Sequence, residues 1–151
     1  MTQTDRIEKT VLLRAPQGRV WRALADEKDF GAWFGCQVEQ PFAEGATVKA
    51  RITNPGYEHL TMEMTVVRID PERYFAYRWH PYAVDPKVDY TAEPTTLVEF
   101  RLEPAEGGTR LTIVESGFDQ IPPARRAEAY RMNDGGWTLQ AKNIDRHVSQ
   151  P

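Results

Sequence analysis

Cysteine and histidine are scarce in this chain of 151 residues. Its single cysteine, Cys36, can form no internal disulfide, and without a second thiolate it anchors no cysteine-based zinc site. The three histidines, His59, His80 and His147, do not have the i, i+4 spacing that places two metal ligands on one helix face. We therefore predict no metal and no cofactor, and we expect a reducing compartment, the cytoplasm.

Long apolar runs and a basic excess are also missing. No stretch approaches the roughly 18 apolar residues of a membrane-spanning helix, and the first residues, MTQTDR, lack the apolar region of a signal peptide. The formal net charge is −3, and lysine and arginine are interspersed with aspartate and glutamate. These features predict a soluble protein that neither inserts into a membrane nor binds nucleic acid.

The apolar content suffices for one hydrophobic core. With 40% hydrophobic residues in 151, the chain has the size and composition of a single domain covering residues 1–151. Near the N-terminus, residues 6–14 read as a strand, and Pro16 then suits the first turn of a helix. Asp26 can end that helix and cap a second short one, which Gly35 breaks.

The middle of the chain alternates apolar and polar residues, which is typical of strands with one buried face. Asn54-Pro55-Gly56 has proline and glycine where a type II turn needs them. The alternation changes phase at Val67, which predicts a β-bulge of the kind that curves a sheet. With the strand at residues 6–14, the pattern gives six or seven strands in hairpin order, the later ones near residues 48–52, 60–69, 75–79, 98–102 and 111–113.

One long helix should close the chain. It is expected to begin between Pro122 and Arg126 and to end near His147. The Gly135-Gly136 pair would let it approach the sheet closely or bend. Its apolar stripe comprises Tyr130, Trp137, Ala141, Ile144 and Val148. The order of elements predicts an α+β fold, in which a curved antiparallel sheet grips this helix and two short helices follow the first strand.

The connection from Pro81 to Pro94 is unusually long for a hairpin. It contains three prolines in 14 residues, whereas hairpin loops usually need two to five residues. Connections of this length are lids, binding loops or simply mobile segments.

Several motifs in the same order resemble the START-like (SRPBCC) superfamily. The opening half contributes Ala15-Pro16, the segment 20–24 (VWRAL) and Trp33-Phe34. The closing half, with segments 109–118 (TRLTIVESGF) and 133–137 (NDGGW), resembles the branch named after the activator of heat-shock protein 90 ATPase. The resemblance covers residues from about 7 to 148.

This resemblance implies a helix-grip fold with a hydrophobic cavity that relatives use for lipids, sterols, polyketides or other apolar molecules. The co-chaperone that gives the branch its name carries a further N-terminal domain, for which this chain has no room. Activation of the chaperone is therefore not the expected role. The expected partner is an apolar small molecule, and a homodimer is left open.

The residues expected to line a ligand cavity are mostly aromatic or sulfur-containing. The same side chains would also serve ordinary core packing, because aromatic rings dominate cores and methionine fills irregular gaps. Phe75 belongs to the same set of inward-facing aromatic residues, but it is not one of the candidate ligand-binding residues. The candidate ligand-binding residues are Trp33, Phe34, Met62, Met64, Tyr77, Trp79, Phe100, Glu115, Tyr130, Asn133 and Trp137.

Glu115 shares the phase of the buried residues of its strand, so its carboxyl group should point inward. It could contact a ligand, or pair with an arginine such as Arg101 or Arg78. No nucleophile elbow, phosphate loop or telling carboxylate pair is present, so no catalytic residue is assigned. The leading hypothesis is a small-molecule-binding protein. The alternatives are a polyketide cyclase-like or aromatase-like enzyme using His80, Tyr77 or Glu115, and a chaperone-linked interaction module.

Overall fold

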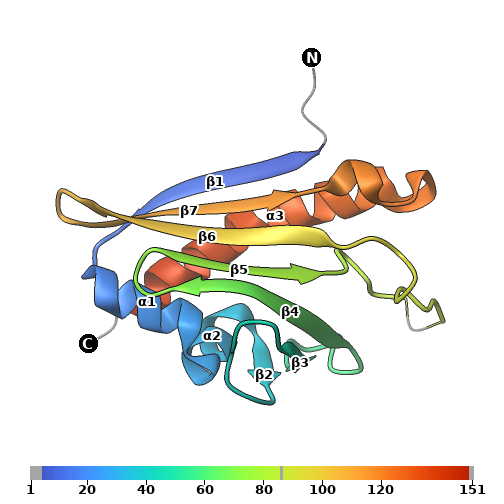
Figure 1. The fold of residues 1–151 in the computed structure, drawn as a ribbon, viewed down its shortest axis with the longest axis horizontal. Helices are drawn as coiled ribbons and strands as arrows, with labels where there is room; N and C mark the ends of the chain where they lie inside the picture. Colours follow the sequence, from blue (N-terminus) through green and yellow to red (C-terminus); the bar gives the residue numbers. More distant parts are fainter. Residues whose placement is uncertain (1–4, 86, 150–151) are drawn as a thin grey trace.

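The computed structural model describes residues 5–85 and 87–149. One antiparallel sheet is covered on one face by a long C-terminal helix, and two short helices follow the first strand (Figure 1). The predicted α+β architecture is therefore confirmed. In chain order the elements are β1 (Arg6–Leu13), α1 (Gln17–Ala25), α2 (Glu27–Phe34), β2 (Cys36–Val38), β3 (Thr47–Ile52), β4 (Thr61–Asp70), β5 (Tyr74–Trp79), β6 (Thr96–Ala105), β7 (Gly108–Ser116), a 3-10 turn (Phe118–Gln120) and α3 (Pro123–Val148).

The sheet has seven strands in the order β1-β7-β6-β5-β4-β3-β2, so each strand from β2 to β7 pairs with its neighbour in sequence. β1 instead crosses to the far edge and pairs with β7, where Ile7 lies opposite Glu115 and Val11 opposite Leu111. The short strand β2 was not anticipated, because its three residues are too few to show an alternating pattern. It fills the seventh place in the predicted range of six or seven.

The turns and the irregularity in the sheet follow the local sequence. The backbone N–H of Tyr57 donates to the carbonyl of Asn54 at 3.0 Å, and Gly56 has a φ of 91°, as a type II turn requires. The pairing of β4 with β5 shifts register between Val66 and Arg68. This confirms the bulge expected at Val67.

The two helix boundaries predicted from capping signals are also confirmed. The Asp26 carboxylate accepts hydrogen bonds from the N–H groups of Lys28 and Asp29, both at 3.0 Å, which caps α2 directly after α1. α3 begins at Pro123, where the missing N–H costs no helical hydrogen bond, and it ends at Val148. In Figure 1 this orange-to-red helix runs diagonally across the sheet.

The close approach predicted for Gly135 and Gly136 is wrong. A Cβ placed on either would meet no atom within 4 Å, and α3 continues through both residues. Close approach occurs elsewhere, because a Cβ on Gly31 would stand 2.3 Å from the carbonyl oxygen of Cys36. Gly31 thus lets α2 pack directly against the start of β2.

Aromatic rings fill the space between the sheet and the middle of α3. Trp137 is only 3% exposed, and its ring centroid lies 5.8 Å from those of both Phe100 and Trp79. Phe34 approaches the same ring from α2 at 6.3 Å. The apolar stripe predicted for this helix therefore packs, at Trp137, against the strand that carries Phe100, and this packing leaves the available hollows at the edges of the helix–sheet layer.

Candidate functional site

A buried carboxyl group organises one end of the helix–sheet layer. Glu115 on β7 is fully buried. Its Oε2 accepts hydrogen bonds from Trp79 Nε1 at 2.8 Å and Thr96 Oγ1 at 2.6 Å. Its Oε1 accepts from Trp137 Nε1 at 2.8 Å, and Asn133 Nδ2 donates to both oxygens at 2.9 and 3.1 Å. We call these five residues the Glu115 cluster.

In the Glu115 cluster, neutral hydrogen-bond donors replace the water that the buried carboxyl group has lost. Burying an unpaired carboxylate is costly unless hydrogen bonds replace the lost water, and here four side chains supply them. The expected pairing of Glu115 with Arg101 or Arg78 is wrong, because Arg101 pairs with Glu99 at 3.1 Å and the contacts of Glu115 are the four neutral donors. The cluster joins β5, β6, β7 and α3, and fixes the orientation of both indole rings.

Tyr77 and Cys36 lie in the core next to this cluster. Burial, reinforced by the nearby Glu115 carboxylate and the Cys36 thiol, raises the pKa of Tyr77 well above its usual value. Its hydroxyl is buried and has no hydrogen-bond partner among the described residues. Burial also raises the pKa of the Cys36 thiol to about 12, so the thiolate needed for nucleophilic chemistry is absent near neutral pH.

A pocket of about 520 Å³ opens beside the Glu115 cluster. We call it the rim pocket. Trp79 and Asn133, which both donate to Glu115, form part of its wall, and Phe34 and Met62 add apolar surface. The remaining lining comes from β3, β4, the turn between them and the long connection after β5, namely Ile52, His59, Leu60, Thr61, Glu63, His80, Tyr82, Ala83, Val84, Asp85, Val88, Tyr90 and Thr91.

Between β5 and β6, the described residues 80–85 and 87–95 form the outer wall of the rim pocket; we call them the rim loop. In Figure 1 it projects from the sheet beyond β5, beside the first turns of α3. At this wall, His80 Nε2 donates to the carbonyl oxygen of Glu93 at 3.1 Å, which ties the two ends of the loop together. In the neutral ring this assignment leaves Nδ1 as an acceptor.

Arg125 in the first turn of α3 holds the rim loop in place. Its Nε donates to Glu93 Oε1 at 2.8 Å, and its Nη1 donates to the carbonyl oxygens of Pro81 at 2.8 Å and Tyr82 at 3.3 Å. The guanidinium carbon also lies 4.8 Å from the centre of the Tyr90 ring, a cation–π contact. One side chain therefore contacts the loop near both ends and in its middle.

The candidate residues from the sequence fall into four groups in space. Four of them line the rim pocket: Phe34, Met62, Trp79 and Asn133. Trp33 borders a different hollow together with Phe34, while Met64, Tyr77, Phe100, Glu115 and Trp137 are buried in the core behind the pocket. Tyr130 lies apart, because its hydroxyl donates to the carbonyl of Arg6 at 2.9 Å and its ring packs on Phe118.

Three contributors were not found from the sequence: Thr96, Glu93 and Arg125. Their roles depend on contacts between segments 19 to 44 positions apart in the chain, which no local pattern encodes. His147, considered in the sequence only for metal-ligand spacing, is part-buried, with Nε2 2.8 Å from Asp29 Oδ1. The sequence contains only an indirect signal for Arg125. A long loop with several prolines needs a contact that holds it, and Arg125 lies at the start of the next predicted helix.

Neither a metal site nor a membrane-spanning helix is found in the described part of the chain. Within residues 5–85 and 87–149, no group of three or more His, Cys, Asp or Glu side chains is arranged to hold a metal ion. Over the same residues, no helix is both long and apolar enough to cross a membrane.

An antiparallel sheet that packs on one long C-terminal helix, with two short helices after its first strand, defines a helix-grip domain of the START-like class. The sequence matches the family described as Activator of Hsp90 ATPase homolog 1-like protein over residues 14–149. The chain therefore belongs to this family. A comparison with curated protein sequences gives no match.

Solved structures with the same fold span nearly the whole chain. Protein MLL2253 from Mesorhizobium loti superimposes with a TM-score of 0.75 at 21% identity, covering 95% of this chain and 96% of that one. DynU16 from the dynemicin biosynthetic locus gives 0.74 at 21% identity, covering 97% of this chain and 48% of its own. The Aha1 dimer from Colwellia psychrerythraea gives 0.71 at 14% identity, with 95% of each chain covered. At these identities the likeness shows the shared fold.

Proposed function

We propose that this protein binds an aromatic or largely apolar small molecule in the rim pocket. The observation that carries the proposal is a hollow of about 520 Å³ whose wall includes Trp79 and Asn133, two side chains already fixed by Glu115. Pockets of a few hundred Å³ with apolar walls and a few placed polar groups are typical of small-molecule sites.

The chemistry of the wall favours a flat apolar ligand with a polar end. Phe34 and Trp79 offer aromatic surface, and the flexible side chain of Met62 can adapt to the outline of a ring. His80, on the loop side, offers a nitrogen acceptor to a hydroxyl group of the ligand.

Fixed walls should reduce the entropic cost of binding. The Trp79 indole would lose rotamer freedom on contact with a ligand if it were mobile, but its hydrogen bond to Glu115 already holds it. Arg125 does the same for the rim loop through Glu93 and the carbonyl of Pro81. The loop then acts as a lid that excludes water from the bound ligand.

The geometry favours binding over acid–base catalysis by the core residues. Both oxygens of Glu115 are occupied by donors, and the Tyr77 hydroxyl is fully enclosed. Of the three groups considered for the enzymatic alternative, His80 is the one on the pocket wall. We place the protein in the cytoplasm, where a lone buried thiol such as Cys36 persists.

The binding site can be tested with a neutral fluorescent naphthalene such as 6-propionyl-2-(dimethylamino)naphthalene. We expect saturable binding to the wild-type protein. Met62→Trp should fill the pocket and weaken binding at least about tenfold, or about 1.4 kcal/mol. The matched control is Val67→Trp, because Val67 is 48% exposed and lies on the same strand outside the pocket. Equal affinities in the two variants, or no saturable binding at all, would contradict the proposal.

The natural ligand is a separate question. Native mass spectrometry of the protein purified from its own host should show a non-covalent adduct in the wild-type protein that is lost in Met62→Trp and kept in Val67→Trp. An adduct retained equally by both variants would place the ligand outside the rim pocket.

A further inference from the structure

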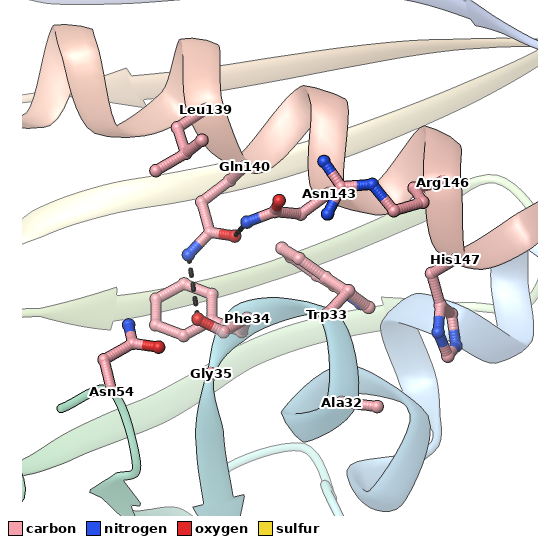
Figure 2. A pocket seen from close by; sticks show the side chains of 10 residues that line it. All are labelled: Ala32, Trp33, Phe34, Gly35, Asn54, Leu139, Gln140, Asn143, Arg146 and His147. Atoms are coloured by element: carbon pink, nitrogen blue, oxygen red, sulfur yellow. Dashed lines mark hydrogen bonds between the residues drawn. The ribbon is translucent and has the colours of Figure 1, made fainter.

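A second hollow lies between the end of α2 and the C-terminal half of α3. Its volume is about 470 Å³, and Phe34 is the one lining residue that it shares with the rim pocket. Figure 2 shows Trp33 and Phe34 on the α2 side and Gln140, Asn143 and other side chains descending from α3. We call this hollow the helix groove.

Hydrogen-bonded amides connect the two helices at the helix groove. α2 ends at Phe34 and Gly35 caps it, which leaves the carbonyl of Phe34 without a helical partner. Gln140 Nε2 donates to that carbonyl at 3.0 Å, and Asn143 Nδ2 donates to Gln140 Oε1 at 3.0 Å (Figure 2). Amide side chains of α3 therefore bridge the two helices beside this hollow.

The mouth of the helix groove carries positive charge without a matching acid. Asp29 Oδ1 lies 2.8 Å from His147 Nε2. The same carboxylate also lies 3.4 Å from Arg22 Nε and 3.8 Å from Arg19 Nη1. Arg146, which lines the groove, has no ion pair or hydrogen bond with any described residue. The Asp29 carboxylate therefore already contacts other basic side chains, and the Arg146 guanidinium is available to pair with a ligand.

We propose that the helix groove binds an aromatic carboxylate. The ring would lie against Phe34 and the edge of Trp33, and the carboxylate would take two parallel hydrogen bonds from Arg146, a pairing that the planar guanidinium favours. The amide chain directs Asn143 Nδ2 to Gln140, which leaves Asn143 Oδ1 as an acceptor for a donor on the ligand. A volume of about 470 Å³ accommodates a two-ring acid.

The experiment is a titration of ¹⁵N-labelled protein with 2-naphthoate and, in parallel, with the neutral 2-naphthamide. The Trp33 indole N–H, bonded to the carbonyl of Ala23 at 2.7 Å, reports on the helix groove, and the Trp79 indole reports on the rim pocket. We expect 2-naphthoate to shift the Trp33 signal saturably. We expect 2-naphthamide to bind about tenfold more weakly, because a hydrogen bond to a charged group is worth about 1.5–3 kcal/mol.

Arg146→Gln should weaken 2-naphthoate binding about tenfold, to the level of the amide, whereas Arg131→Gln should change it little. Arg131 is the matched control because it is an exposed arginine on the same helix outside the groove. Equal losses in both variants would indicate general charge attraction and overturn the proposal. A lack of saturable shifts would do the same. Shifts confined to Trp79 would overturn the groove site and leave the rim-pocket function intact.

Discussion

Replacing Glu115 with glutamine tests whether the donors around it determine stability. The substitution keeps the size of the side chain but turns one of its two acceptor oxygens into an N–H₂ donor. Oε1 faces the indole N–H of Trp137, and Oε2 faces the indole N–H of Trp79. An indole N–H can only donate, so whichever way the new amide is turned, one tryptophan faces a second donor and loses its partner.

The expected size of the effect follows from this geometry. A buried donor left without an acceptor costs about 1–3 kcal/mol. Two effects offset part of this: the Thr96 hydroxyl can rotate and accept from the new amide, and a neutral side chain has less hydration to lose on burial. We expect Glu115→Gln to lower the free energy of unfolding by about 2 kcal/mol.

The assay is urea unfolding at pH 7 followed by tryptophan fluorescence, with Glu103→Gln as the control. Glu103 is exposed on β6, and the same chemical change there should cost less than about 0.5 kcal/mol. The comparison requires unchanged denaturant slopes, since a changed slope reports on the unfolded state. A loss below about 0.5 kcal/mol for Glu115→Gln, or a gain, would mean that relief of desolvation outweighs the lost acceptor and would refute the reasoning.

Three further predictions rest on single features of the structure. Trp137→Ala should lower the free energy of unfolding by about 3–5 kcal/mol, against less than about 0.5 for the exposed Leu139→Ala; similar values in denaturant melts would contradict the core assignment. Because the pKa of the Cys36 thiol is raised from 9.0 to about 12, its neutral form favours the folded state up to about pH 9, and this contribution is lost as the pH rises towards 12. Alkaline melts should therefore fall less steeply for Cys36→Ala, and a parallel fall would argue against it. Arg125→Gln should speed hydrogen exchange in the rim loop about tenfold or more without melting the sheet, and unchanged exchange would show that Glu93 and Tyr90 are held by other contacts.

Local patterns in the sequence predicted the elements whose causes are local. Alternation gave the strands, the phase change at Val67 gave the bulge, and Asp26 gave the boundary between the two short helices. β2 was missed because three residues carry too little periodicity. The close approach expected at Gly135 and Gly136 was wrong because a glycine pair indicates a permissive backbone but does not say which surface lies opposite.

The candidate site was predicted only in outline. Alternation placed the Glu115 side chain inward, and the apolar phases of β4 and β5 supplied Met62 and Trp79. Local patterns offered no means of choosing between a ligand, an arginine and neutral donors as partners of Glu115. In the structure the partners are the neutral donors, because strand pairing and the position of α3 bring side chains such as Asn133 within hydrogen-bond distance of Glu115.

The sequence alone determined the α+β class, the order of elements and the residues facing the core, because these follow from periodicity, capping and turn chemistry over a few neighbouring positions. Only the tertiary structure decided that aromatic rings fill the centre and that the rim pocket and the helix groove lie to either side of Phe34. It also decided that Arg125 holds a loop more than 30 positions away. Those features depend on how side chains from distant segments pack against one another. Such long-range packing cannot be inferred from the pattern of any single stretch of sequence.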